Sequence, residues 1–105
     1  MIVTFDREYL RDLYQFGKTS DEKYRFQPEI IQKYKRCIDM LLSANGVEVL
    51  YTIKSLNYEM LKGNKKGISS IRINKQYRIE FTVIGNHAEP IVTVCNILEL
   101  SNHYK

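Results

Sequence analysis

Two arginines in the second half of the chain, Arg72 and Arg78, have the residue type and the spacing to bind a phosphate together. They lie in the segment SIRINKQYRIEF, in which apolar and polar residues alternate on both sides of a polar connection. This pattern predicts a β-hairpin. A three-residue connection, 74–76, keeps the isoleucines on one face and places Arg72 directly opposite Arg78. A connection one residue later would place Tyr77, a good strand former, in the turn, so we favour the first register.

The sequence leaves two interpretations of this arginine pair open. Like charges directly opposite on a sheet destabilise it by up to about 1 kcal/mol, so something should offset their repulsion. Glu80, diagonal to Arg72, could bridge the two arginines on a solvated face. Alternatively, the two planar guanidinium groups converge on an anion such as a phosphate, a geometry that arginine supports better than lysine.

A lysine-rich loop directly precedes the first arginine strand. Taken alone, Lys62, Lys65 and Lys66 indicate only a solvated surface, but beside paired arginines they extend a basic groove suited to a nucleic-acid backbone. Three tyrosines could stack on bases or could simply pack: Tyr51, Tyr58 and Tyr104.

Composition restricts the class of protein. With 105 residues, the chain is long enough for one domain, spanning 1–105, and its 44% hydrophobic and 27% charged residues are typical of a globular protein. The net charge of +4 favours acidic or polyanionic partners. No apolar run approaches the roughly 20 residues of a membrane span, and the first residues lack the pattern of a signal peptide. We therefore expect a cytoplasmic protein that does not contact membranes.

Cysteine and histidine usage argues against a metal enzyme. Cys37 and Cys95 fall in a predicted helix and strand, with no CxxC pair, which indicates buried free thiols. His87 and His103 are the only histidines and lack the spacing of zinc ligands. We expect no metal or other cofactor.

Helical patterns dominate the first half of the chain. A short strand at 2–5 precedes a helix that starts with Asp6 as its N-cap and runs through Phe16 to Gly17. After a polar loop, Pro28 opens a long amphipathic helix that stops at Asn45-Gly46. Its apolar stripe comprises Ile30, Ile31, Tyr34, Cys37, Ile38, Leu41 and Leu42.

The second half changes to the period of strands. Periodicity does not separate a short helix from a strand over 47–54, and the segment 56–61 is expected to pack beneath a loop. Strands follow over 69–73, 77–83 and 91–100, the last of which is apolar on both faces and therefore central or well covered. The fold class is α+β, with two N-terminal helices and a short third on one face of a small, mainly antiparallel sheet.

The segment LKGNKKGISSIRINKQYRIEF, residues 61–81, resembles the signature of HigB-like toxins in the RelE/ParE superfamily of bacterial type II toxin–antitoxin systems. The resemblance implies a RelE/ParE-like fold and a ribosome-dependent, metal-independent endoribonuclease that cleaves mRNA and arrests translation. It also implies a cognate antitoxin of the helix-turn-helix type as a partner, besides the ribosome and mRNA. DNA would be contacted only through the antitoxin.

The same resemblance suggests roles for individual residues. Arg72 and Arg78 would stabilise charge on the scissile phosphate, and His103 and Tyr104 would complete the catalytic set. The expected RNA contacts are Lys62, Lys65, Lys66, Asn74 and Gln76. The chain departs from its relatives in the segments Ser55–Tyr58, which has no histidine, and 101–104, which reads Ser-Asn-His-Tyr rather than ending in Asp-Tyr-His.

Two other functions fit the same fold and basic character. One is a ParE-like inhibitor of DNA gyrase that cleaves no RNA. The other is a non-enzymatic module whose basic sheet face binds an acidic protein segment. Mapped transcript ends, gyrase-dependent DNA breaks and translation in a cell-free extract distinguish the three.

Overall fold

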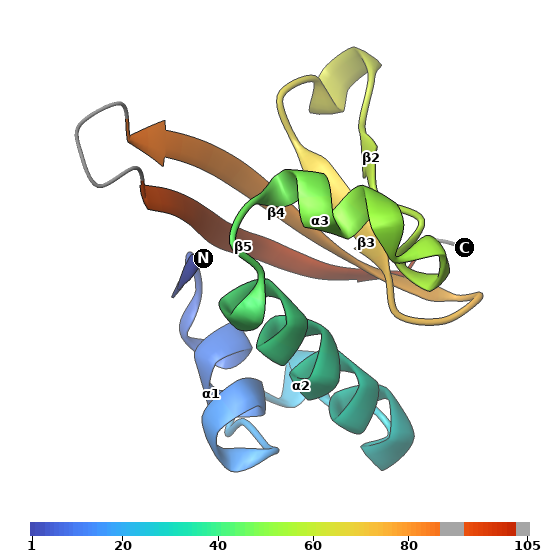
Figure 1. The fold of residues 1–105 in the computed structure, drawn as a ribbon. Helices are drawn as coiled ribbons and strands as arrows, with labels where there is room; N and C mark the ends of the chain where they lie inside the picture. Colours follow the sequence, from blue (N-terminus) through green and yellow to red (C-terminus); the bar gives the residue numbers. More distant parts are fainter. Residues whose placement is uncertain (87–91, 103–105) are drawn as a thin grey trace.

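The computed structural model describes residues 1–86 and 92–102, which form helices packed against one face of a five-stranded sheet (Figure 1). This arrangement confirms the predicted α+β class. The helices are α1 Glu8–Phe16, α2 Pro28–Ser43 and α3 Val47–Thr52, with 3-10 turns η1 Glu22–Tyr24, η2 Lys54–Leu56 and η3 Gly63–Lys65. The strands are β1 Ile2–Phe5, β2 Glu59–Met60, β3 Ser69–Arg72, β4 Tyr77–Asn86 and β5 Val92–Asn102.

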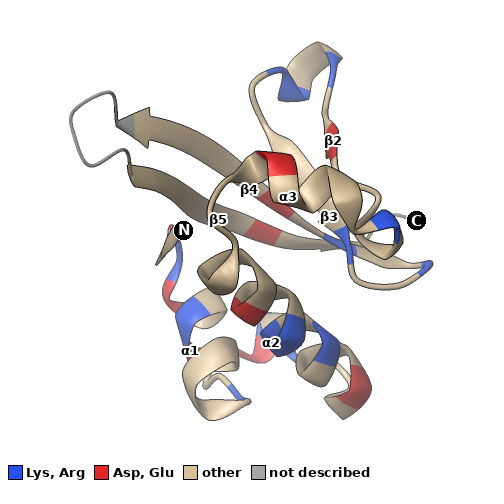
Figure 2. Cartoon of the chain, viewed as in Figure 1, with Lys and Arg blue, Asp and Glu red and all other residues tan. Residues whose placement is uncertain are grey.

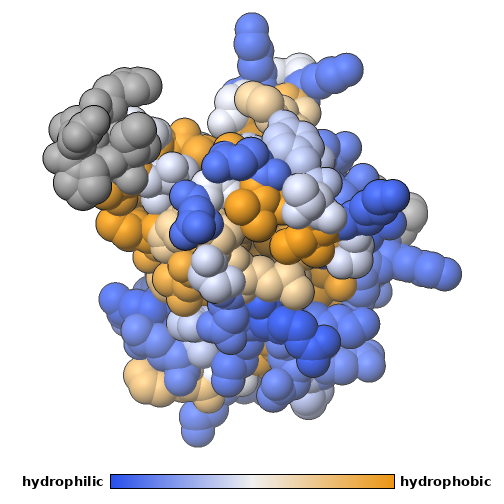
Figure 3. Space-filling model, in the orientation of Figure 1, coloured by the Kyte–Doolittle hydropathy of each residue, from blue (hydrophilic) through white to orange (hydrophobic). Residues whose placement is uncertain are grey.

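The sheet has the strand order β1-β5-β4-β3-β2. Strand β1 runs parallel to β5, with Val3 beside Cys95, while the other neighbouring strands are antiparallel. Strand β5 therefore has a partner on each side, which confirms its prediction as a central strand. The β4–β5 hairpin extends away from the helices (Figure 1), and hydrophobic surface is visible where it leaves the body of the protein (Figure 3).

The long helix α2 supplies much of the core, as its apolar stripe predicts. Six of its residues are buried, and Pro28 opens it at the first helical position. Leu42 is the exception, since it is 43% exposed, and its assignment to the buried stripe was wrong. No helix in 1–86 or 92–102 is long and apolar enough to cross a membrane.

The start of α1 differs from the sequence expectation. The N-cap is Arg7 and not Asp6, and no side chain caps the helix there. Strand β1 instead continues its pairing past Phe5, since the Asp6 backbone N–H donates to the Ile97 carbonyl at 2.8 Å, and the helix begins only after this bond. Gly17 ends α1 in the left-handed conformation, as predicted.

The structure also shows the form of residues 47–54, which periodicity left ambiguous, and of residues 56–61, which were expected to pack beneath a loop. Residues 47–52 form helix α3, which buries Leu50, and Leu56 is buried just after it. Glu59 and Met60 pair with Ser70 and Ser69 as an edge strand, which the sequence did not predict. Two residues are too few to show alternation, so this strand is defined only by its neighbour β3.

Tyr34 joins α1 to α2 and provides a test of core stability. It is fully buried, and its hydroxyl donates to the Leu10 carbonyl at 2.7 Å. Tyr34→Phe should lower the free energy of unfolding by about 1 kcal/mol at pH 7, measured by denaturant titration. Burial raises the pKa of Tyr34 above its usual value, so the unfolded chain ionises first as the pH rises. The stabilising effect of Tyr34 should therefore shrink above pH 10. Tyr51→Phe is the control because Tyr51 is exposed, and an equal loss in both variants would contradict the assignment.

Candidate functional site

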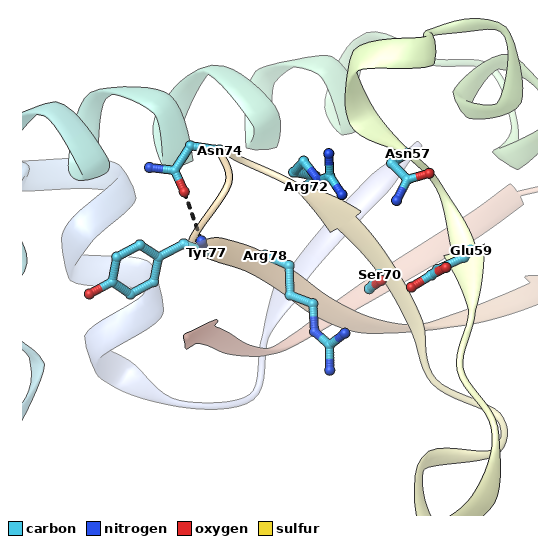
Figure 4. Close-up of a pocket in the computed structure, with 7 residues that line it drawn as sticks. All are labelled: Asn57, Glu59, Ser70, Arg72, Asn74, Tyr77 and Arg78. Carbon is cyan, nitrogen blue, oxygen red and sulfur yellow. Dashed lines mark hydrogen bonds between the residues drawn. The ribbon is translucent and has the colours of Figure 1, made fainter. Parts of the chain in front are cut away.

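The arginine hairpin has the predicted register. Ile71 pairs with Ile79 and Arg72 pairs with Arg78, and the Ile73 N–H donates to the Tyr77 carbonyl at 3.0 Å. Within the turn, Asn74 Oδ1 accepts hydrogen bonds from the backbone N–H groups of Gln76 at 2.8 Å and Tyr77 at 2.7 Å (Figure 4 draws the bond to Tyr77). An asparagine side chain that bonds to the backbone in this way stabilises a tight turn. Asn74 thus helps to fix the positions of both arginines.

Both arginines line one shallow pocket at the β2 side of the sheet (Figure 4). Its volume of about 20 Å³ holds little more than one water molecule. The pocket is an open depression on the surface and not an enclosed cavity. Its lining residues are Asn57, Glu59, Ser70, Arg72, Asn74, Tyr77 and Arg78. We call this depression the arginine pocket.

Arg78 is held by a buried carboxylate. Its Nε and one terminal nitrogen each lie 3.0 Å from Glu80 Oε2, and Lys65 Nζ contacts the same carboxylate at 2.9 and 3.0 Å. Glu80 is only 2% exposed. The expectation that Glu80 bridges the two arginines on a solvated face was therefore wrong. Glu80 instead connects Arg78 to the lysine-rich loop, because Lys65 of η3 contacts the same carboxylate.

Arg72 is exposed and has no hydrogen bond or ion pair with any residue of 1–86 or 92–102. In Figure 4 its guanidinium lies toward Asn57, whereas that of Arg78 extends away from it. The two groups share a pocket but do not converge on one point. Of the two, Arg72 is the arginine that forms no ion pair with a carboxylate of the described residues.

Sequence reasoning missed a carboxylate and an amide in this pocket. Glu59 is exposed on β2 and forms no ion pair within the described part of the chain. Asn57 ends η2 in the left-handed conformation, with φ of 45°, two residues before it. Their position in the sequence could have indicated them, since both lie within the four residues before the Leu61-Lys62-Gly63 turn. A search of this segment for a proton acceptor near the arginines would have found Glu59.

Several other predicted site residues lie outside the arginine pocket. Lys62 and Lys66 are exposed on the loop, and Gln76 is exposed in the turn. Tyr51 and Tyr58 contact each other edge to face with ring centroids 4.7 Å apart, and Tyr58 also binds Ser69. Tyr77 packs against the core and against Phe26, as expected of a residue on the core side, and it also lines the pocket. His103 and Tyr104 lie outside the described residues, as does His87.

The described residues include no group of three side chains placed to hold a metal ion. The side chains of the arginine pocket offer an exposed guanidinium, a second guanidinium held by an ion pair, a carboxylate with no ion pair among the described residues, and an amide. A carboxylate can accept a proton and a guanidinium can stabilise negative charge, but an arginine cannot readily donate a proton at neutral pH. This set suits an anionic substrate that loses a proton during the reaction.

Comparison with known proteins gives one family. The model described as a RelE-like toxin of the type II toxin–antitoxin system HigB matches residues 3–93. The chain is 33% identical over 82 residues to Toxin HigB-1 of Vibrio cholerae serotype O1, which covers 77% of this chain and 82% of that toxin. An uncharacterised protein of Haemophilus influenzae is 29% identical over 82 residues, covering 76% of this chain and 81% of its own.

Solved structures share the fold at lower identity. The YoeB/ParE toxin from Agrobacterium tumefaciens superposes with a TM-score of 0.61 at 17% identity, covering 99% of this chain and 100% of that one. A heterotetrameric YoeB-YefM toxin–antitoxin complex from Staphylococcus aureus matches with a TM-score of 0.56 at 21% identity, over 99% and 98% of the two chains. At these identities the likeness establishes the architecture alone.

Proposed function

Since this chain belongs to the HigB-like family of RelE-like toxins from type II toxin–antitoxin systems, we propose that it arrests translation by cleaving mRNA on the ribosome. The observation that carries this proposal is the arginine pocket. It joins two cross-strand guanidinium groups to a carboxylate that has no described partner. These groups can provide two of the contributions that cleavage of an RNA phosphodiester needs, a base and positive charge.

Cleavage by the RNA's own 2′-hydroxyl needs three contributions. A base removes the hydroxyl proton, cations stabilise the charge that develops on the phosphate, and an acid protonates the departing 5′-oxygen. The products are a 2′,3′-cyclic phosphate and a free 5′-hydroxyl. No step needs an oxidant or a second substrate.

We assign these contributions as follows. Arg72 contacts the scissile phosphate, since its charge is exposed beside the pocket. Arg78, oriented by Glu80, contributes a second positive charge from a fixed position. Glu59 is the proposed base, and His103 or Tyr104 remains the proposed acid. Lys62 and Lys66 on the loop contact RNA further from the reaction.

The proposed partner besides the ribosome is an antitoxin that inhibits this chain in the cytoplasm. The related Staphylococcus aureus toxin is found in a toxin–antitoxin complex. An acidic segment of a small protein encoded beside this chain would be attracted to Arg72 and the basic loop. A helix-turn-helix protein in the adjacent reading frame that restores growth on co-expression would support this pairing.

Controlled expression with transcript-end mapping tests the proposed activity. New 5′ ends within translated messages, dependent on ribosome binding, are the expected result. Gyrase-dependent DNA breaks without new RNA ends would identify the chain as a gyrase inhibitor. Unchanged translation in a cell-free extract would leave only the binding module.

The role of Glu59 gives a separate prediction. Glu59→Gln keeps the size and polarity of the side chain but removes its ability to accept a proton, so mRNA cleavage should slow by about 10²- to 10³-fold. The rate is measured with purified ribosomes and a defined message. Glu29→Gln, an exposed carboxylate on α2 outside the pocket, should cleave at the wild-type rate. Equal rates for both variants would remove Glu59 from the mechanism.

A further inference from the structure

A second basic cavity lies next to the arginine pocket, between α2, η2 and the end of β3. It has a volume of about 140 Å³. Three cations line it, Lys33 and Arg36 from α2 and Arg72 from β3, together with Ser55. The remaining lining side chains are uncharged and apolar or weakly polar: Cys37, Met40, Leu56 and Ile73. We call it the α2 cavity.

All the charged side chains described as lining the α2 cavity are positive. No carboxylate is among its lining residues, and Lys33, Arg36 and Arg72 form no ion pair with residues of the described ranges. All three are exposed, so their charges are accessible to a ligand. Figure 2 shows the basic turns of α2 facing the basic end of β3. The cavity therefore attracts an anion, since none of the described residues that line it carries a negative charge.

The apolar lining of the cavity, which we call its floor, consists of Cys37, Met40, Leu56 and Ile73. Cys37 and Leu56 are buried, and burial raises the pKa of the Cys37 thiol to about 11, so this floor carries no charge at neutral pH. Sulfur atoms of cysteine and methionine make favourable contacts with aromatic rings. A flat aromatic ring with an attached negative charge fits this combination of floor and rim. An RNA nucleotide has both features.

Arg72 lines both the α2 cavity and the arginine pocket. A strand of RNA whose phosphate lies in the arginine pocket can therefore continue past Arg72 to Lys33 and Arg36. We infer that the α2 cavity is a second nucleotide subsite, in which the three cations bind a phosphate and the apolar floor contacts its base. This inference rests on the proposed function, because it extends the path of the same RNA.

An acidic peptide is the competing occupant, and the observations favour RNA over it. A peptide in a groove must satisfy its backbone N–H and C=O groups, and the neutral polar side chain that this cavity offers is Ser55 alone. RNA presents a phosphate to the three cations and the flat face of a base to the apolar floor. The continuity through Arg72 also matches a polymer with regularly spaced charges.

Methyl NMR of the full-length protein tests the subsite directly. The ligand is a tetranucleotide of 2′-O-methyl RNA, which cannot be cleaved because its 2′-oxygens carry no proton. The methyl resonances of Met40, Leu56 and Ile73 should shift on binding, while that of Ile84, exposed on the distant hairpin, should not. Absence of shifts at the three cavity methyls under saturating RNA would overturn the proposal.

Charge variants test the phosphate contacts. Lys33→Gln with Arg36→Gln should weaken binding about tenfold and reduce the slope of log K against log salt by about 1.4, the value for two contacts with single strands. Lys35→Gln, on the same helix but outside the cavity, is the matched control. A tetranucleotide with abasic sites should bind more weakly to the wild type. Affinity of the double variant within twofold of wild type would overturn the proposal, as would tighter binding of hexaglutamate at the same methyls.

The subsite and the proposed reaction can fail separately. Shifts at the cavity methyls in a protein that cleaves no mRNA on ribosomes would retain the subsite and exclude the reaction. Cleavage of mRNA by a protein whose cavity methyl resonances do not shift would support the reaction and exclude the subsite. Ribosome binding by the double variant in the absence of mRNA then distinguishes the source of the nucleotide. Weaker ribosome binding assigns the cavity to ribosomal RNA, and unchanged ribosome binding assigns it to mRNA.

Discussion

Bacteria that express the Arg72→Ala variant should grow like uninduced cells, because the variant should cleave mRNA about 10²- to 10³-fold more slowly than the wild type. That range is typical for loss of one group that stabilises the charge of a transition state. Arg72 is exposed and has no described partner within the protein, so its removal leaves no buried charge behind. The effect on the fold should be small, which separates catalysis from stability. Growth rate and mapped RNA ends measure the first, and thermal unfolding measures the second.

The hairpin itself offers the control for this variant. Lys75 is an exposed cation in the same turn that does not line either basic cavity. Lys75→Ala removes the same charge and should remain toxic. A folded, fully toxic Arg72→Ala protein would exclude Arg72 from the mechanism. Arg78→Ala is less informative alone, because it also removes a partner of buried Glu80.

Glu80→Ala should lower the free energy of unfolding by about 2 kcal/mol and slow cleavage about tenfold. Removing one member of a buried ion pair usually destabilises a protein by more, about 3–5 kcal/mol. Here the side chains of the remaining cations, Lys65 and Arg78, are 44% and 19% exposed, so water can solvate them after the change. The loss of activity arises because Arg78 and Lys65 both lose their ion pair with the carboxylate of Glu80.

Two further variants isolate this effect. Glu99 lies opposite Glu80 on β5 but is exposed, so Glu99→Ala should change stability by less than about 0.5 kcal/mol. The double variant Arg78→Ala with Glu80→Ala should be less destabilised than the sum of its single variants, since both remove the same interaction. Additive losses would show that Arg78 and Glu80 are not coupled.

The features that sequence predicted well are those set by local periodicity. Helix α2 is predicted by its apolar stripe. The register of the β3–β4 hairpin is predicted by the alternation of apolar and polar residues, because Ile71 and Ile79 must share the core face. Once those residues are fixed, Arg72 and Arg78 can only be cross-strand partners. The family resemblance rests on the same stretch of chain.

The features that sequence did not predict depend on contacts between distant segments. Glu80 reads as an exposed strand residue until Lys65, fifteen positions earlier, folds over it. Strand β2 is defined only by its pairing with β3, and this pairing places Glu59 in the pocket that the arginines line. The α2 cavity needs α2, η2 and β3 in one place, and each of them separately shows only a few basic residues.

Strand β1 lies beside β5, and Thr4 bonds to Asn96 across 92 positions of the chain. Such a distant pairing cannot form until the later segment has been synthesised and has left the ribosome. The edge of the sheet therefore closes late, after the arginine hairpin has been made. We expect a growing chain to complete its five-stranded sheet only after β5 has left the ribosome.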